Sequence, residues 1–212
     1  YVYSPNISNS TPVKTISNFC LDTNSPYTSP LDTGTHNYGH LAGGDINGDG
    51  FSDLLSGNFL SNCAFVFYGN RPETSLDFNT SGLTGHPERG FQIIDSHGDP
   101  ILQLGLGFSF LGDTNGDGIG DMAIANINRY SDAGSQSVYV LFGNSNQINS
   151  VDLNNLKSGT STLGYVIHAD PNLPLLGVNL GYEGTKCASD FNGDGLNDLV
   201  IEGATYPEVL VG

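Results

Sequence analysis

The sequence predicts an all-β protein made of repeated sheets of about four strands each. Gly (29), Pro (10), Tyr (10) and Phe (11) are abundant, whereas only 13% of the 212 residues are charged. This composition is typical of short strands joined by tight turns, not of helices with charged outer faces. The hydrophobic content of 37% is enough for a substantial core in one large domain or a short array of repeats.

An acidic motif of nine residues occurs three times, so the chain is internally repetitive. Six of the nine positions are identical in all three copies, which span residues 45–53, 113–121 and 190–198. The motif starts lie 68 and 77 residues apart (113 − 45 and 190 − 113). This spacing is too long for a helix pair and suits a four-stranded sheet with its loops.

Short runs at constant places around the motif predict the strands of each unit. A glycine lies six residues before each motif: Gly39, Gly107 and Gly184. Apolar runs follow each motif directly, at residues 54–55, 122–124 and 199–201. Aromatic and β-branched runs that close on Gly come next, at 65–69, 138–143 and 209–212, and fourth runs lie at 91–94 and 165–168. Runs this short, bounded by Gly and Asn, favour strands over helices.

These units resemble the FG-GAP repeat, the blade of the β-propeller in integrin alpha subunits and related extracellular proteins. Tyr38-Gly39 nearly matches the Phe-Gly pair that opens the family's pattern, while the other two units keep only its Gly. The family's Gly-Ala-Pro corner corresponds to Gly57-Asn58, Ala125-Asn126 and a displaced Gly203-Ala204. The resemblance implies propeller-type blades at 38–105 and 106–178 and a partial one at 179–212.

The resemblance also implies an incomplete ring, because propellers have four to eight blades. The Ser/Thr/Pro/Asn-rich segment 1–37 opens with possible strands at 1–3 and 13–16, which we expect to complete a neighbouring blade. The chain is then part of a longer protein, or another copy completes it. In the second case, strands near 1–3 would add to the sheet around 209–211 of another copy and join copies head to tail into a fibre or a larger propeller.

We expect each motif to bind one Ca²⁺, three in all. Calcium prefers six to eight oxygen ligands, and acids at alternating loop positions direct their oxygens to one point. The expected ligands, with a backbone carbonyl at position seven, are Asp45, Asn47, Asp49, Phe51 and Asp53; Asp113, Asn115, Asp117, Ile119 and Asp121; and Asp190, Asn192, Asp194, Leu196 and Asp198. Glycines at positions four and six permit the left-handed turns that surround an ion. The loops hold nine of the 22 acids, so three Ca²⁺ would move the formal charge from −16 to −10.

Three other interpretations of the motif fit the sequence less well. An EF-hand needs a Glu at position twelve, where this chain has Ser56, Ile124 and Ile201. A plain hairpin turn explains Asn-Gly-Asp-Gly but does not explain a ninth Asp in every copy. Mg²⁺ is disfavoured because it prefers to keep its own waters.

The net charge disfavours some classes of partner, and the glycosylation sequons indicate a location. A charge of −16 disfavours nucleic acid and anionic lipid, and no apolar run is long enough to span a membrane as a helix. Sequons at Asn6, Asn9 and Asn79 support an extracellular or cell-surface glycoprotein. The three cysteines, Cys20, Cys63 and Cys187, form at most one internal disulfide or are all small buried residues.

Nothing in the sequence nominates a catalytic nucleophile. The five histidines lack metal-protease spacing, and the polar cluster at 95–99 is read as a solvated turn more readily than as a catalytic group. Tyr1, Tyr3, Tyr27 and Tyr38 are candidates for a sugar-binding surface, although strand aromatics mostly pack. We therefore expect a non-enzymatic, calcium-stabilised structural or adhesion module that meets itself, another extracellular protein or a glycan. The alternative is an accessory or carbohydrate-binding domain of a secreted enzyme or lectin.

Overall fold

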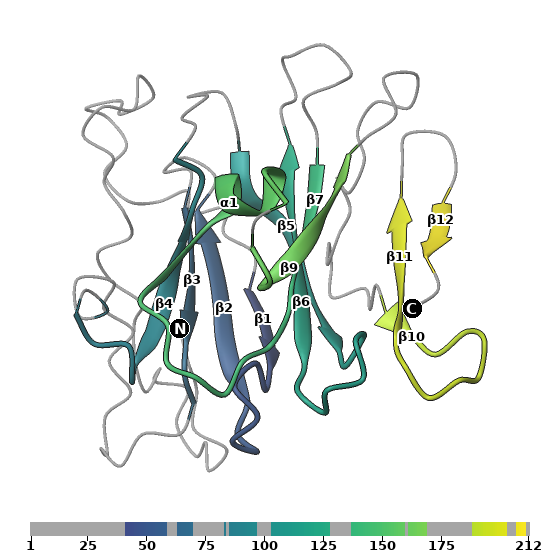
Figure 1. Cartoon of the computed structure of the whole chain (residues 1–212), viewed down its shortest axis with the longest axis horizontal. Coiled ribbons are helices and arrows are strands. Elements are labelled where there is room, and N and C mark those ends of the chain that lie inside the picture. The colour runs from purple at the N-terminus through teal and green to yellow at the C-terminus, as the bar shows by residue number, and fades with distance from the viewer. Residues whose placement is uncertain are drawn as a thin grey trace, which may run out of the picture.

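A computed structural model of the chain is all-β, with three sheets side by side (Figure 1). It describes residues 41–58, 63–69, 83, 85–96, 103–127, 137–159, 161–168, 188–202 and 207–210. The expected N-terminal strands, the segment 1–37, the three sequons, the four candidate tyrosines, Cys20 and Cys187 lie outside these residues. Within the described part, no helix has the length and apolar character needed to cross a bilayer.

The first sheet contains the four strands predicted for the first repeat and one more. Its order is β1 (Leu41–Gly44), β2 (Asp53–Asn58), β3 (Cys63–Phe67), β4 (Gly90–Ile94) and β8 (Ser150–Asp152). The first four pair antiparallel with their sequence neighbours, whereas β8 pairs parallel with β4. The strand β8 was not predicted, and it brings part of the second repeat to the edge of the first sheet.

The second and third sheets repeat the same order of strands. The second is antiparallel, with β5 (Gln103–Gly112), β6 (Asp121–Ile127), β7 (Ser137–Leu141) and β9 (Gly164–His168). The third contains β10 (Ala188–Ser189), β11 (Asp198–Glu202) and β12 (Pro207–Leu210). The strands expected after each motif are confirmed. Among the described residues the sheets have five, four and three strands, so the first has one strand more than the expected four, the second has four, and the third has the three strands of a partial unit.

The second sheet is the middle layer because it is apolar on both faces. Alternate residues of a strand point to opposite faces. In β6, Met122 and Ile124 join the core shared with the first sheet, whereas Ala123 and Ala125 join the core shared with the third. Strand β7 alternates in the same way between the two cores. Each sheet is therefore held by side-chain packing against its neighbour, as repeated units in a stacked array are.

A short helix, α1 (Leu153–Lys157), follows β8 and contributes Leu153 and Leu156 to the first core. Asp152 caps it by accepting a hydrogen bond from the Asn154 N–H. Lys157 donates a hydrogen bond of 2.8 Å to Asp95, whose side chain is fully buried. The expectation of a solvated turn is thus wrong at Asp95, because this carboxylate is a buried partner of a lysine from the second repeat.

Candidate metal centres

The three acidic motifs form equivalent loops on one edge of the structure. Each connects the first and second described strands of its sheet, and all three lie along the lower edge in Figure 1. The EF-hand is excluded, since strands and not helices flank each loop. Its twelfth position falls on Ser56, Ile124 and Ile201, which are buried strand residues.

The first Asp of each loop holds the loop backbone in place. In the first loop, Asp45 Oδ1 accepts hydrogen bonds from the Gly48 N–H (2.7 Å) and the Asp49 N–H (3.1 Å), and Oδ2 accepts from the Gly50 N–H (2.8 Å). Asp113 and Asp190 accept from the two glycines of their own loops in the same way. The side chain thus satisfies N–H groups that a tight loop would otherwise leave to solvent.

The loop glycines adopt the left-handed conformation that the sequence predicts. Gly48 and Gly50 have φ of 74° and 85°. The equivalent glycines of the other two loops have φ between 80° and 93°. Residues with a Cβ rarely adopt this conformation, so the glycines at positions four and six are required by the course of the backbone.

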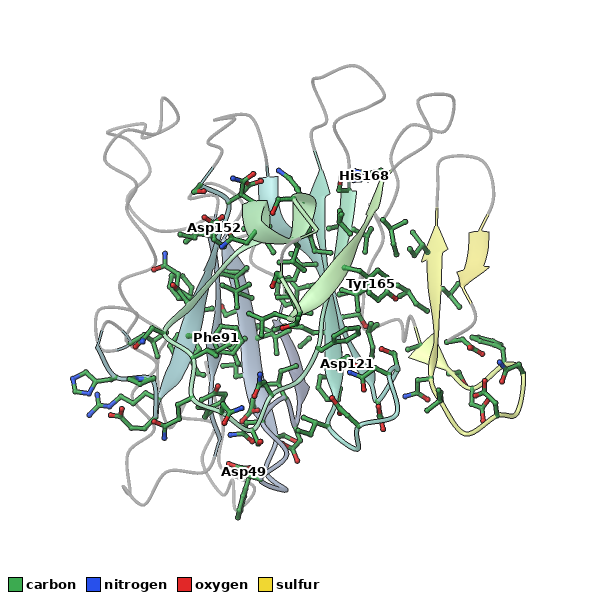
Figure 2. All side chains as sticks on the ribbon, in the orientation of Figure 1. Asp49, Phe91, Asp121, Asp152, Tyr165 and His168 are labelled. Atoms are coloured by element: carbon green, nitrogen blue, oxygen red, sulfur yellow. The ribbon has the colours of Figure 1, made fainter. Side chains whose placement is uncertain are left out.

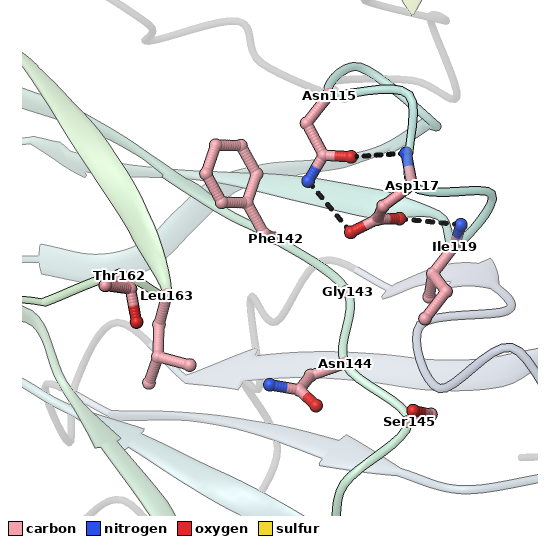
Figure 3. Close-up of a pocket in the computed structure, with 9 residues that line it drawn as sticks. All are labelled: Asn115, Asp117, Ile119, Phe142, Gly143, Asn144, Ser145, Thr162 and Leu163. Atoms are coloured by element: carbon pink, nitrogen blue, oxygen red, sulfur yellow. Dashed lines mark hydrogen bonds between the residues drawn. The ribbon is translucent and has the colours of Figure 1, made fainter.

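Positions three and five form a linked pair on the outside of each loop. Asn47 Nδ2 donates to Asp49 Oδ2 (3.1 Å), while Asn47 Oδ1 accepts from the Asp49 N–H (3.0 Å) and Asp49 Oδ1 accepts from the Phe51 N–H (2.9 Å). The same three contacts recur in the second loop, as Figure 3 shows, and in the third. Five of these six side chains are exposed, and Asn47 is half-buried.

The ninth Asp differs, because it lies beneath the loop and is buried. Asp53 is 2% exposed, and it accepts hydrogen bonds from the Ile46 N–H (2.9 Å) and the Gly69 N–H (2.8 Å). Asp121 accepts from Thr114 and from the Gly143 N–H in the corresponding way (Figure 2 labels Asp49 and Asp121). One carboxylate therefore forms a bracket that links the start of the loop to a glycine two residues after the third strand.

The third loop has the first of these two hydrogen bonds, because Asp198 accepts from the Phe191 N–H at 2.7 Å. The residue that would donate the second bond lies outside the described residues. Sequence reasoning assigned the ninth Asp only to the ion and missed its role as a bracket. The glycine that follows the third strand, Gly69 or Gly143, was the available signal, since it recurs after that Asp in both repeats.

Burial and like charge act on these carboxyl groups. Burial is the main cause that raises the pKa of Asp53 to about 6; two backbone N–H bonds oppose the rise, and the charges of Asp49 and Asp45 add to it. Burial also raises the pKa of Asp121, with Asp117 adding to the shift. A cation at the loop would favour the charged form of both carboxyl groups.

The donor set fits calcium by its chemistry. Every candidate side-chain donor is a carboxylate or an amide oxygen, and none of the nine-residue motifs contains Lys, Arg or His. The ion pairs seen in the described part of the chain, His86–Glu88, Arg89–Glu88 and Lys157–Asp95, lie outside the loops. Among the described residues, however, no three acidic, His or Cys side chains converge on one point. To bind an ion, the side chains at positions three and five of each loop would therefore have to give up their mutual hydrogen bond and rotate toward the ion.

A hollow of about 270 Å³ lies beside the second loop (Figure 3). Its wall includes Asn115 and Asp117 of the loop, and its other polar residues are Asn144, Ser145 and Thr162. Phe142 supplies an aromatic ring, which lies 5.8 Å from the ring of Tyr165.

The remaining titratable candidates are dispersed over the described part of the chain. His86 is exposed and contacts Glu88 at 2.9 Å, and His168 contacts Ser137 at 3.2 Å. Cys63 lies in β3.

No protein-family model and no curated protein matches the chain. The resemblance to FG-GAP repeats therefore depends on the motif and its flanks alone.

Proposed function

We propose that this chain is a calcium-stabilised structural module whose three sheets are FG-GAP-like blades of β-propeller type, each with one Ca²⁺ in its acidic loop. The observation that carries the proposal is the equivalence of the loops. All three have the same hydrogen bonds from two glycines to position one, the same contacts between positions three, five and seven, the same pair of left-handed glycines and the same buried ninth Asp. A chance turn sequence would not reproduce this arrangement three times at one edge.

In this proposal the ion is held by the side chains at positions one, three, five and nine and by the carbonyl at position seven. Bound calcium would supply positive charge among three carboxylates that otherwise repel one another. The ninth Asp makes the effect structural, because Asp53 and Asp121 already connect loop and sheet through buried hydrogen bonds. Neutralising them would stabilise the sheet as well as the loop.

The proposed setting is extracellular. Calcium sites of extracellular modules typically have dissociation constants of about 10⁻⁴ to 10⁻³ M, which suit loops that must rearrange to bind. An adhesion or scaffold role follows from the repeated architecture, in which rigid blades present loops and edges to an extracellular protein or glycan.

A calcium titration with thermal unfolding tests the proposal. With free Ca²⁺ at about ten times the dissociation constant, each site adds about 1.4 kcal/mol, so three sites add about 4 kcal/mol. For a chain of this size, that corresponds to a rise in melting temperature of roughly 8–16 °C. Equilibrium dialysis with ⁴⁵Ca should give a stoichiometry of three, and Asp49→Asn should reduce it to two. An unchanged melting temperature in 10 mM Ca²⁺ would refute structural calcium sites.

The hollow beside the second loop favours a second candidate, carbohydrate binding. Asn144, Ser145 and Thr162 offer hydroxyl and amide groups to a sugar, Phe142 offers an apolar ring, and Asp117 places a candidate calcium ligand at the wall. A glycan array followed by calorimetry on the best ligand tests it, with Thr162→Val and Asn144→Ala as the variants. Binding that both variants leave unchanged would place the sugar elsewhere, and an array without signal would leave the structural role as the proposal.

A further inference from the structure

Each loop contacts the loop before it, and the contacts run from the same positions of the later loop to the same positions of the earlier one. Position eight of the second loop donates to position one of the first loop, from the Gly120 N–H to the Asp45 carbonyl at 3.2 Å. Position seven of the second loop covers position four of the first, because a Cβ built on Gly48 would lie 3.2 Å from the Ile119 side chain. The Asn144 N–H also donates to the carbonyl of Ile46, at position two of the first loop.

The same rule joins the second loop to the third. The Asn197 N–H, at position eight, donates to the Asp113 carbonyl at 2.9 Å. Leu196, at position seven, lies 3.4 Å from a Cβ built on Gly116. The two junctions therefore use equivalent atoms although the residues at positions seven and eight differ. The rule belongs to the backbone of the loops, and it does not depend on one particular side chain.

The two ends of this row expose complementary halves of the same junction. The first loop presents positions seven and eight, where Phe51 is 53% exposed. The third loop presents positions one to four, where Phe191 is 59% exposed and no atom of the described residues lies within 4 Å of a Cβ built on Gly193. At the internal junction, by contrast, Ile46 at position two is only 2% exposed.

Large exposed apolar side chains at both ends are unusual for a stacked array. Terminal units of such arrays normally have polar outer faces, which keep them from stacking further. Phe51 and Phe191 are two of the four large hydrophobic side chains that are strongly exposed among the described residues. Along the lower edge in Figure 1, the second loop lies between the first and third, so the two ends face apart.

We propose that a second copy of this chain docks its first loop on the third loop of the preceding copy. Phe51 of the incoming copy covers Gly193 and contacts Phe191, and the Ser52 N–H donates to the Asp190 carbonyl, as Gly120 does to Asp45 within the chain. The contact is heterologous, so it builds open chains of copies or closed rings. It uses backbone atoms and apolar side chains, so it does not rest on the calcium proposal.

Two variants, each blocking one end, test the docking. Sedimentation velocity of the whole chain at about 0.1 mM detects self-association with a dissociation constant in the micromolar range. We expect wild type to form species larger than a dimer. Phe51→Glu and Phe191→Glu should each remain monomeric, with the self-association constant weakened more than tenfold. Mixed in equal amounts, the two variants should form dimers and nothing larger, because each keeps one intact end.

Tyr165→Glu is the matched control, since Tyr165 is also exposed (41%) but lies in β9, away from both end loops. It should assemble like wild type. Each measurement is made in excess Ca²⁺ and in EDTA, and circular dichroism verifies that the variants are folded. Wild type that stays monomeric in both conditions would overturn the proposal, as would a mixture without dimers or end variants that assemble normally. Loss of calcium binding alone would not.

Discussion

Substitutions at positions five and nine of the second loop should differ in their effect on stability without calcium and lose the same calcium contribution when it is present. We compare Asp117→Asn with Asp121→Asn, which make the same chemical change to an exposed and to a fully buried carboxylate. In EDTA, Asp121→Asn should lower the melting temperature and Asp117→Asn should leave it nearly unchanged. In Ca²⁺, both variants should lose the contribution of one site.

The magnitude follows from the hydrogen bonds of Asp121. Its two oxygens accept from the Thr114 N–H at 2.8 Å and from the Gly143 N–H at 2.9 Å. An asparagine has one oxygen and one N–H₂ group, so one of these buried backbone donors loses its acceptor. An unsatisfied buried donor costs about 2 kcal/mol. For a chain of this size, that is a fall in melting temperature of roughly 4–8 °C.

Asp117 lacks this cost, because water replaces its partners at the exposed end of the loop. The expected change in EDTA is within about 0.5 kcal/mol. With Ca²⁺ at about ten times the dissociation constant, the same variant loses the roughly 1.4 kcal/mol that one site supplies. The two substitutions therefore separate the bracket made by position nine from the ion held by the loop.

Differential scanning calorimetry of wild type and both variants, in EDTA and in Ca²⁺, measures all six values under one protocol. Dialysis with ⁴⁵Ca gives the number of sites that remain. If Asp121→Asn has the same melting temperature as wild type in EDTA, the buried hydrogen bonds of Asp121 contribute no stability and the reasoning fails. If Asp117→Asn keeps all three sites, position five is not a ligand.

Three further predictions concern the fold around the loops. Gly143→Ala should destabilise the chain by about 3 kcal/mol or more, measured by urea unfolding, because its Cβ would lie 2.3 Å from a backbone oxygen of the second loop; a stable variant would contradict this packing. Lys157→Met should cost about 3 kcal/mol by leaving the buried Asp95 charge without its partner, and Asp95→Asn in the same chain should recover part of that loss; a double variant no more stable than Lys157→Met would argue against the pairing. In EDTA, the contribution of Asp53 to stability should fall as pH rises from 3.8 to about 6, because its raised pKa means that the folded chain holds this proton more tightly than the unfolded chain. The free energy of unfolding of Asp53→Asn, measured over the same pH range, should lack this decrease.

The strands and loops were predictable because their signals are local. An apolar run after each acidic motif, and a Gly-closed run after that, predicted β2, β6 and β11 and the strands that pair with them. The left-handed glycines followed from the same pattern, since no other residue adopts that backbone readily. The repeat strengthened these predictions of strands and loops, because a pattern that occurs three times is less easily a product of chance than one that occurs once.

The features that escaped prediction depend on contacts between distant parts of the chain. Strand β8 has three residues and no motif, and it forms only because β4 offers an edge to residues 58 positions further along the chain (150 − 92). The burial of Asp95 depends on Lys157 in the same way. The junctions between loops use backbone atoms, which any sequence possesses, so no residue type announces them.

The parallel pairing of β8 with β4 has a consequence for how the protein comes apart. The chain leaves the second sheet after β7, adds β8 to the first sheet and returns to the second sheet at β9. Separating the first two sheets would therefore pull a strand out of one of them, so they should exchange amide hydrogens as a single cooperative unit. Within the described residues, the third sheet exchanges no strand with the others, and it should open first. The unit of folding in this protein is then larger than the unit of sequence repetition.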